Sequence, residues 1–88
     1  MKYTVRLEKA AEKQLEKLPA EILDKVSQQL MHLEHNPRQR NVKKLRGVEG
    51  YRIRVGDYRI LFTIDDKIKE VRVYRVKHRS QPGLSLEM

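Results

Sequence analysis

The fold of this chain is constrained most by residues 51–64, YRIRVGDYRILFTI, where apolar and polar side chains alternate around a Gly-Asp pair. Such alternation is typical of strands with one buried face, and a two-residue turn at Gly56 and Asp57 joins two of them in a hairpin. In that register Arg54 lies directly opposite Arg59, and both side chains point to the same side of the sheet.

The two faces of the predicted hairpin differ in character. One face is continuous and apolar, and it consists of Tyr51, Ile53, Val55, Tyr58, Ile60, Phe62 and Ile64. The other face carries Arg52, Arg54 and Arg59 together with Leu61 and Thr63. We therefore expect helices to cover the first face and to leave the arginines exposed.

The segment before the hairpin is typical of one short strand followed by two amphipathic helices. Pro19 ends the first helix and opens the second, which ends before Pro37 because the residue preceding a proline avoids helical angles. The predicted fold class is α+β, with a helical hairpin packed on one face of a mostly antiparallel four-stranded sheet in the order β-α-α-β-β-β. The expected elements are a strand at 2–7, helices at 8–18 and 19–35, a loop at 38–50, and strands at 51–55, 58–64 and 68–76.

Length and composition exclude several kinds of protein. With 88 residues the chain has room for one core, so we expect a single domain over 1–88, with 80–88 as a loose tail. The absence of cysteine excludes disulfides, thiol catalysis and cysteine-based zinc sites. His32 and His35 lie one helical turn apart, but no third ligand has an obvious route to them, so no metal site is predicted. No apolar run approaches the roughly 20 residues of a membrane helix, and we expect a cytoplasmic protein without a membrane partner.

Positive charge is concentrated in one quarter of the chain. The formal net charge is +8. Residues 38–59 contain only two acidic residues, Glu49 and Asp57. The basic residues of the same segment are Arg38, Arg40, Lys43, Lys44, Arg46, Arg52, Arg54 and Arg59. Like charges placed opposite each other destabilise a sheet, so clustered guanidinium groups favour a surface that binds an anion. Arginine holds phosphate through two parallel hydrogen bonds, which points to nucleic acid, while an acidic protein partner stays the alternative.

Three segments carry a resemblance to a known family: KLRG at 44–47, YRIRVGDYRILF at 51–62 and VYRVKHR at 73–79, all behind a helical pair that ends in Asn-Pro. With its elements in the same order over residues 3–79, the sequence resembles the RelE branch of the RelE/ParE toxin superfamily. The resemblance implies a toxin of a type II toxin–antitoxin system, with a microbial-ribonuclease-like fold, which enters the ribosomal A site and cleaves mRNA. It also implies a cognate antitoxin, a toxin–antitoxin hetero-oligomer, and no metal or cofactor.

The resemblance further implies roles for individual residues. Cleavage in this family proceeds by attack of the RNA 2′-hydroxyl on the adjacent phosphate, and Arg59 and Arg79 are expected to stabilise the transition-state charge. Arg52 and Arg54 stand where some relatives have lysine, and since arginine is a poor proton acceptor, they are expected to hold phosphates. His78 is a further candidate for acid–base catalysis, because an imidazole changes its charge near neutral pH. The concentration of positive charge, in turn, leads us to expect contacts with RNA or the ribosome from Arg38, Arg40, Lys43, Lys44 and Arg46.

Two alternatives to the nuclease stay open. The family often has a tyrosine a few residues after the His-Arg pair, whereas HRSQPGLSLEM contains none. This departure fits a weakly active or inactive relative that acts only as a cationic binding module. The other alternative is a ParE-like toxin, which uses the same fold to poison DNA gyrase without cutting RNA.

Overall fold

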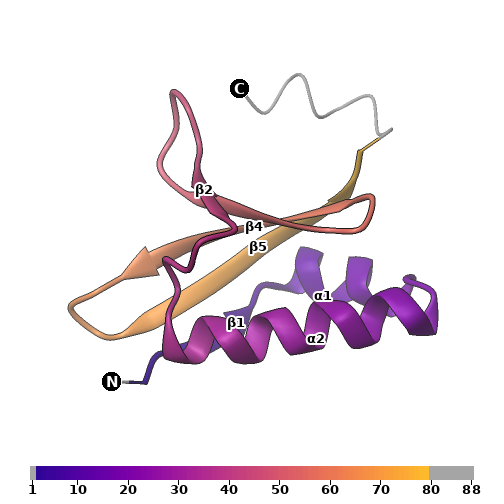
Figure 1. Ribbon diagram of the computed structural model, residues 1–88, viewed down its shortest axis with the longest axis horizontal. Helices are drawn as coiled ribbons and strands as arrows, with labels where there is room; N and C mark the ends of the chain where they lie inside the picture. Colours follow the sequence, from indigo (N-terminus) through magenta and orange to yellow (C-terminus); the bar gives the residue numbers. More distant parts are fainter. Residues whose placement is uncertain (1, 80–88) are drawn as a thin grey trace.

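A computed structural model of the chain describes residues 2–79 (Figure 1). Its elements in chain order are β1 (Thr4–Leu7), α1 (Lys9–Glu16), α2 (Ala20–His35), β2 (Val42–Lys44), β3 (Tyr51–Val55), β4 (Tyr58–Asp65) and β5 (Glu70–His78). The expected loose tail at 80–88 lies outside the described residues. None of the helices within residues 2–79 is both long and apolar enough to cross a membrane.

The strands form one sheet in the order β1-β5-β4-β3-β2. The neighbours from β2 to β5 pair antiparallel, and β1 pairs parallel with β5 at the edge of the sheet. Both helices cover the same face, with α1 against β5 and α2 against β1 and β3 (Figure 1). The predicted α+β class, with two helices on one face of a mostly antiparallel sheet, is confirmed.

The sheet has five strands, whereas the sequence pattern predicted four. The additional strand is β2, which lies in the segment 38–50 that the polar, basic sequence predicted to be a loop. Within it Val42 pairs with Ile53 and Lys43 pairs with Arg52. Three residues are too few to show an alternating pattern, and basic side chains are common on edge strands because they discourage further pairing.

The β3–β4 hairpin has the predicted register, with Arg54 opposite Arg59. Gly56 has a φ of 60°, a left-handed conformation that glycine adopts without steric cost. The helix-facing side of the hairpin forms the centre of the core, where Ile53, Ile60 and Phe62 are fully buried. The helices contribute Ala11, Leu15, Val26 and Leu33 to the same core.

A β-bulge interrupts the pairing of β4 with β5. Leu61 lies opposite Arg75 and Phe62 lies opposite Val73, so Tyr74 is an additional residue of β5 between these two pairs. Bulges of this kind shift the parity of a strand by one residue. This shift explains why the buried valines of β5 do not alternate strictly along the sequence.

Candidate functional site

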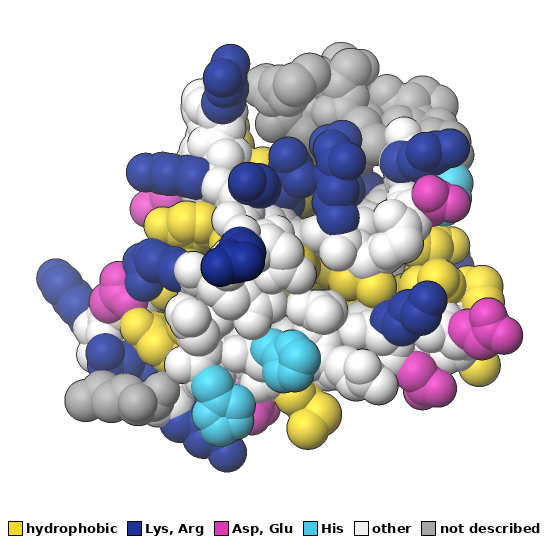
Figure 2. Space-filling view, in the orientation of Figure 1, with side chains coloured by type: hydrophobic (Ala, Val, Ile, Leu, Met, Phe, Trp, Pro, Cys, Tyr) yellow, Lys and Arg dark blue, Asp and Glu magenta, His cyan; other side chains and the backbone are white. Residues whose placement is uncertain are grey.

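The sheet face opposite the helices carries a dense group of basic side chains. Figure 2 shows Lys and Arg side chains gathered above the sheet, on the side away from the helices. Because directly paired residues point to the same side, the register assigns two rows to this face. One row is Lys43, Arg52, Leu61 and Arg75, and the other is Arg54, Arg59 and Lys77. We call the six basic residues of these rows the cationic face.

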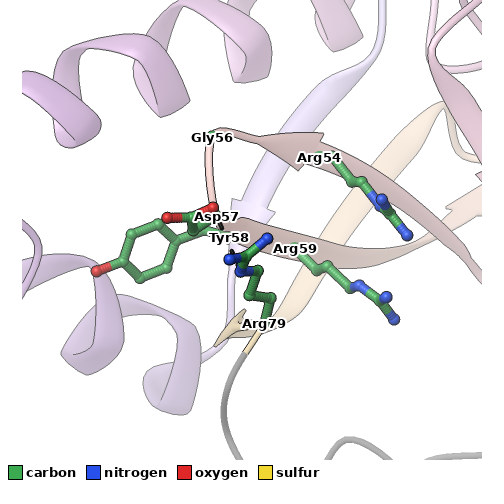
Figure 3. A pocket seen from close by; sticks show the side chains of 6 residues that line it. All are labelled: Arg54, Gly56, Asp57, Tyr58, Arg59 and Arg79. Carbon is green, nitrogen blue, oxygen red and sulfur yellow. Dashed lines mark ion pairs between the residues drawn. The ribbon is translucent and has the colours of Figure 1, made fainter.

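The three hairpin arginines lie together on this face. Figure 3 shows Arg54 and Arg59 extending side by side from adjacent strands, whereas Tyr58 points the opposite way. Within residues 2–79, no carboxylate forms an ion pair with Arg52, Arg54 or Arg59. The pKa of Arg52 is lowered, first by partial burial and then by the charges of Arg54 and Arg59. Positive charge accumulates here without a compensating acid, as in surfaces that receive an anionic ligand.

A small cavity lies at the turn end of the hairpin, where Arg79 joins the group (Figure 3). Its lining includes Arg54, Arg59 and Arg79, and its volume is about 130 Å³. The Arg79 N–H donates to the Asp57 carbonyl oxygen at 2.8 Å, and the Arg79 Nε lies 3.6 Å from the Asp57 carboxylate. Since a water molecule takes about 30 Å³ of liquid volume, the cavity has room for a tetrahedral anion among the guanidinium groups.

A second hollow adjoins the first. It is lined by Asn41, Lys43, Arg52 and Arg54 and has a volume of about 370 Å³. Arg54 belongs to the lining of both hollows. Two neighbouring anionic groups of one ligand can therefore be held on either side of a single guanidinium group.

The remaining half of this sheet face is electrically balanced. Arg6 and Arg72 lie opposite each other on β1 and β5. Both form ion pairs with Glu70, at 2.8 Å and 2.9 Å, and Glu8 lies 3.9 Å from Arg72. The cationic face is thus a bounded region over β2, β3, β4 and the C-terminal half of β5.

Arg38, a predicted RNA contact, does not join the cationic face. Its Nη1 and Nη2 donate to the two carboxylate oxygens of Asp66 at 3.1 Å and 2.9 Å, and its guanidinium lies 5.6 Å from the centre of the Tyr51 ring. Tyr3 donates its hydroxyl to the same carboxylate at 2.7 Å. The hydrogen bonds from Arg38, and then that from Tyr3, lower the pKa of Asp66 to about 2. Arg38 therefore ties the segment after α2 to the β4–β5 turn.

The other predicted RNA contacts are dispersed around β2. Lys43 belongs to the cationic face, whereas Lys44 pairs with Tyr51 and points to the opposite side. Arg40 and Arg46 are exposed in the loops that flank β2. The structure thus brings one of the five predicted contacts together with the hairpin arginines.

His78 lies on the helix side of the sheet. It pairs directly with Tyr58, and the two rings meet edge to face with centres 5.0 Å apart. Tyr58 and Arg59 are successive residues of β4, so their side chains point to opposite faces. The structure therefore places His78 on the face of the sheet opposite the cationic face.

Two members of the cationic face were missed by the sequence reasoning. Arg75 is exposed and lies opposite Leu61, and Lys77 is buried and lies opposite Arg59. Both occur in the segment VYRVKHR, two residues apart, which is the spacing of one strand face. The bulge at Tyr74 concealed this, because it breaks the alternation that would have placed them.

Comparison with known proteins identifies the family. A sequence model of the ParE toxin of type II toxin–antitoxin systems, parDE, matches residues 5–83. No curated protein sequence matches the chain. Among solved structures, the toxin–antitoxin complex RelBE2 from Mycobacterium tuberculosis contains a chain that is 38% identical, with a TM-score of 0.81, over 90% of this chain and 100% of that one.

Two further structures agree with this assignment. The archaeal RelE–RelB complex from Pyrococcus horikoshii is 30% identical with a TM-score of 0.79, over 92% of this chain and 99% of that one. The intact RelBE complex from E. coli is 24% identical with a TM-score of 0.79, over 90% and 99% of the two chains, and shows the shared fold. The chain therefore belongs to the ParE toxin family of type II toxin–antitoxin systems, and within the RelE/ParE superfamily it belongs to the RelE branch.

Proposed function

We propose that the protein is a ribosome-dependent endonuclease that cleaves mRNA in the A site and thereby stops translation. The observation that supports this most directly is the set of hairpin arginines on one face, with Arg79 beside them at the turn. Guanidinium groups bind phosphate through paired hydrogen bonds, and a row of them fits the regularly spaced phosphates of a nucleic acid strand.

The proposed reaction uses the 2′-oxygen of the RNA as the nucleophile. A bond forms between this oxygen and the adjacent phosphorus while the bond from phosphorus to the 5′-oxygen breaks. The products are a 2′,3′-cyclic phosphate and a free 5′-hydroxyl. A proton passes from the 2′-hydroxyl to solvent water and another passes from solvent water to the departing 5′-oxygen, while negative charge grows on the non-bridging oxygens.

The arginines are assigned to charge stabilisation and positioning. Arg59 and Arg79 line the small cavity, where they would stabilise the growing charge on the non-bridging oxygens. Arg54 lines both hollows and would hold the reacting phosphate and its neighbour in register. Arg52 would hold the neighbouring phosphate. Arginine keeps its charge at any working pH, so these roles do not depend on proton transfer by the side chains.

The proposal includes a cognate antitoxin and a cytoplasmic site of action. The relatives from M. tuberculosis and P. horikoshii were solved as toxin–antitoxin complexes. By extension we assign this chain to a hetero-oligomer in which a partner of the RelB type neutralises it. Ribosomes and mRNA then become its targets when the partner is lost.

The test is a reconstituted translation reaction in which cleavage sites on the mRNA are mapped by primer extension. The protein should cut within the codon in the A site, and only when ribosomes are present. Arg59→Ala should abolish most of this cleavage. Arg6→Ala is the matched control, because it removes an arginine from the balanced half of the same sheet face. Intact mRNA with the wild-type protein, or equal losses in both variants, would contradict the proposal.

A second candidate is poisoning of DNA gyrase, which is favoured by the match to the ParE toxin model over residues 5–83. Expression in cells would then induce a DNA damage response while mRNA stays intact. Purified gyrase would also lose supercoiling activity in the presence of the protein. Harmless expression with neither effect would identify a cationic binding module without its own activity.

A further inference from the structure

The bulge in β5 changes which side chains reach the cationic face. Val73 is fully buried on the helix side, so the next residue, Tyr74, points to the opposite side. Arg75 pairs with Leu61 and points to that side as well. An aromatic ring and a guanidinium group from successive residues therefore stand on the same face, and bulges next to active sites commonly redirect side chains in this way.

Tyr74 lies where the loop between β2 and β3 meets the cationic face. A Cβ atom placed on Gly50 would be 3.4 Å from the Tyr74 hydroxyl and 3.3 Å from the Leu45 side chain. Gly50 is buried with a φ of 137°, so the absence of a side chain there allows Tyr74 and Leu45 to approach the loop backbone. The Tyr74 hydroxyl therefore lies close to the backbone of this loop, and the residue is half-buried.

The surroundings of Tyr74 combine apolar contact with positive charge. Leu61 is buried on this face, and its row continues on either side to Arg52 and Arg75. The other aromatic side chains of residues 2–79 pack with the core on the helix side, and they are Tyr3, Tyr51, Tyr58 and Phe62. In the part of the chain that the structure describes, Tyr74 is thus the aromatic residue of the cationic face.

We propose that Tyr74 stacks on a nucleobase of the bound RNA, while Arg52 and Arg75 hold the phosphates on either side of that base. Aromatic side chains beside basic rows are the usual means of gripping single-stranded RNA, because every base offers a flat apolar face. This inference rests on the proposed RNA cleavage. Tyr74 would help to place the substrate, and it would take no part in the chemical step.

The test uses the absence of tryptophan from the chain. Tyr74→Trp creates a single fluorescent reporter at the site. The ligand is a short single-stranded oligonucleotide with 2′-O-methyl groups, which cannot be cleaved because the nucleophilic hydroxyl is blocked. The tryptophan emission of the Tyr74→Trp protein should be quenched as this oligonucleotide saturates the protein. An oligonucleotide of equal phosphate count that lacks the bases should bind through the arginines without quenching. Unchanged emission on confirmed binding of the base-containing ligand would overturn the inference.

Affinity measurements give a second readout. Tyr74→Phe should keep the affinity for the base-containing ligand within about twofold, and Tyr74→Leu should lower it about tenfold or more. Neither variant should change the affinity for the abasic ligand. An equal loss for both ligands in Tyr74→Leu would show that Tyr74 only packs the loop. If the wild-type protein binds neither ligand at low salt but still cleaves mRNA on ribosomes, this inference is overturned and the proposed function stands. Binding without a preference for bases also overturns this inference alone.

Discussion

Arg54 and Arg59 lie directly opposite each other on adjacent strands, although like charges in that position oppose sheet formation. No carboxylate within residues 2–79 relieves either of them. This pair lowers stability by a small amount, and the structure offers no reason for it other than the binding of an anion. At the scale of single residues, the hairpin is therefore a place where stability and activity oppose each other.

Arg54→Thr should raise stability while it lowers activity. The substitution removes the repulsion from Arg59 and introduces a residue that favours strands, so we expect the free energy of unfolding to rise by ~0.2–1 kcal/mol. Urea denaturation of the two proteins would measure this, with RNA cleavage followed in parallel. Arg6→Thr is the control, because it loses an ion pair with Glu70 and should not gain stability. A destabilised Arg54→Thr protein would show that Arg54 has a structural role instead.

Arg79→Ala should lower the rate of RNA cleavage by about 10²–10³-fold, the range typical of losing one group that stabilises transition-state charge. The side chain is mostly exposed and its backbone hydrogen bond to Asp57 is retained, so the fold should persist. Single-turnover cleavage on programmed ribosomes would give the rate, and calorimetry would show whether the antitoxin still binds. Full activity of the variant would remove Arg79 from the proposed mechanism.

The sequence could place the hairpin arginines but not all of their neighbours. Alternation around the Gly-Asp turn set the face of Arg52, Arg54 and Arg59, because a strand has a fixed period of two. Arg38 was assigned to the same surface from charge alone, yet it pairs with Asp66, which is 28 residues away. Partners so distant in sequence are created by the fold, and local patterns do not contain them.

At the scale of elements, the loop between β2 and β3 depends on two glycines with different surroundings. Gly50 has a φ of 137°, and a Cβ there would lie 3.2 Å from the Phe62 carbonyl oxygen. Gly47 has a φ of 75°, and a Cβ there would meet nothing within 4 Å. Both substitutions strain the backbone, but only the first also forces neighbouring atoms apart.

Gly50→Ala should therefore destabilise the protein more than Gly47→Ala. We expect a loss of ~1–3 kcal/mol for the first, and about 1 kcal/mol for the second from its left-handed backbone alone. Thermal unfolding of both variants would measure the difference. Equal midpoints would mean that the close approach of the loop to β4 and Tyr74 does not constrain the fold.

The link between Arg38 and Asp66 should make stability depend on pH. The pKa of Asp66 falls from 3.8 to about 2 in the folded protein, so its contribution is fully present above about pH 4. It should be lost as the pH falls from about 4 to about 2, because the carboxylate becomes protonated and releases Arg38. Asp66→Asn should lack this contribution at neutral pH and match the wild-type protein near pH 2. The measurement is the free energy of unfolding of both proteins at several pH values. A difference between them that stays constant from neutral pH to pH 2 would contradict this role.

The elements with a long, regular pattern of apolar residues were predicted from the sequence. The elements that depend on pairing with a neighbouring strand were not. The helices and the β3–β4 hairpin follow from apolar periodicity and from Pro19 and Pro37. Strand β2 and the bulge at Tyr74 depend on which strand lies alongside, and their own sequences are too short or too irregular to show it. The same two features determine which face of the sheet Lys43, Arg75 and Lys77 occupy, so this placement could not be predicted from the sequence either.

At the scale of the whole molecule, the open face of the sheet has two halves that differ in charge. The cationic face occupies one half, and the basic residues of the other half form ion pairs with Glu70 and Glu8. Arg52→Gln should therefore reduce the salt dependence of RNA binding, lowering the slope of log K against log salt by ~0.7 per lost phosphate contact. Arg6→Gln, in the balanced half, should leave the slope unchanged. Titrations of a labelled, uncleavable RNA at several salt concentrations would measure both slopes, and equal slopes would mean that the cationic face does not contact phosphate.

The parallel pairing of β1 with β5 also has a consequence for biosynthesis. Residues 4–7 are made early, yet their partners are residues 70–73, so the sheet cannot close while the last strand is still inside the ribosomal exit tunnel. Arg75, Lys77 and Arg79 emerge with that strand. A nascent chain is therefore unable to display the complete cationic face until β5 has left the exit tunnel and paired with β1 and β4.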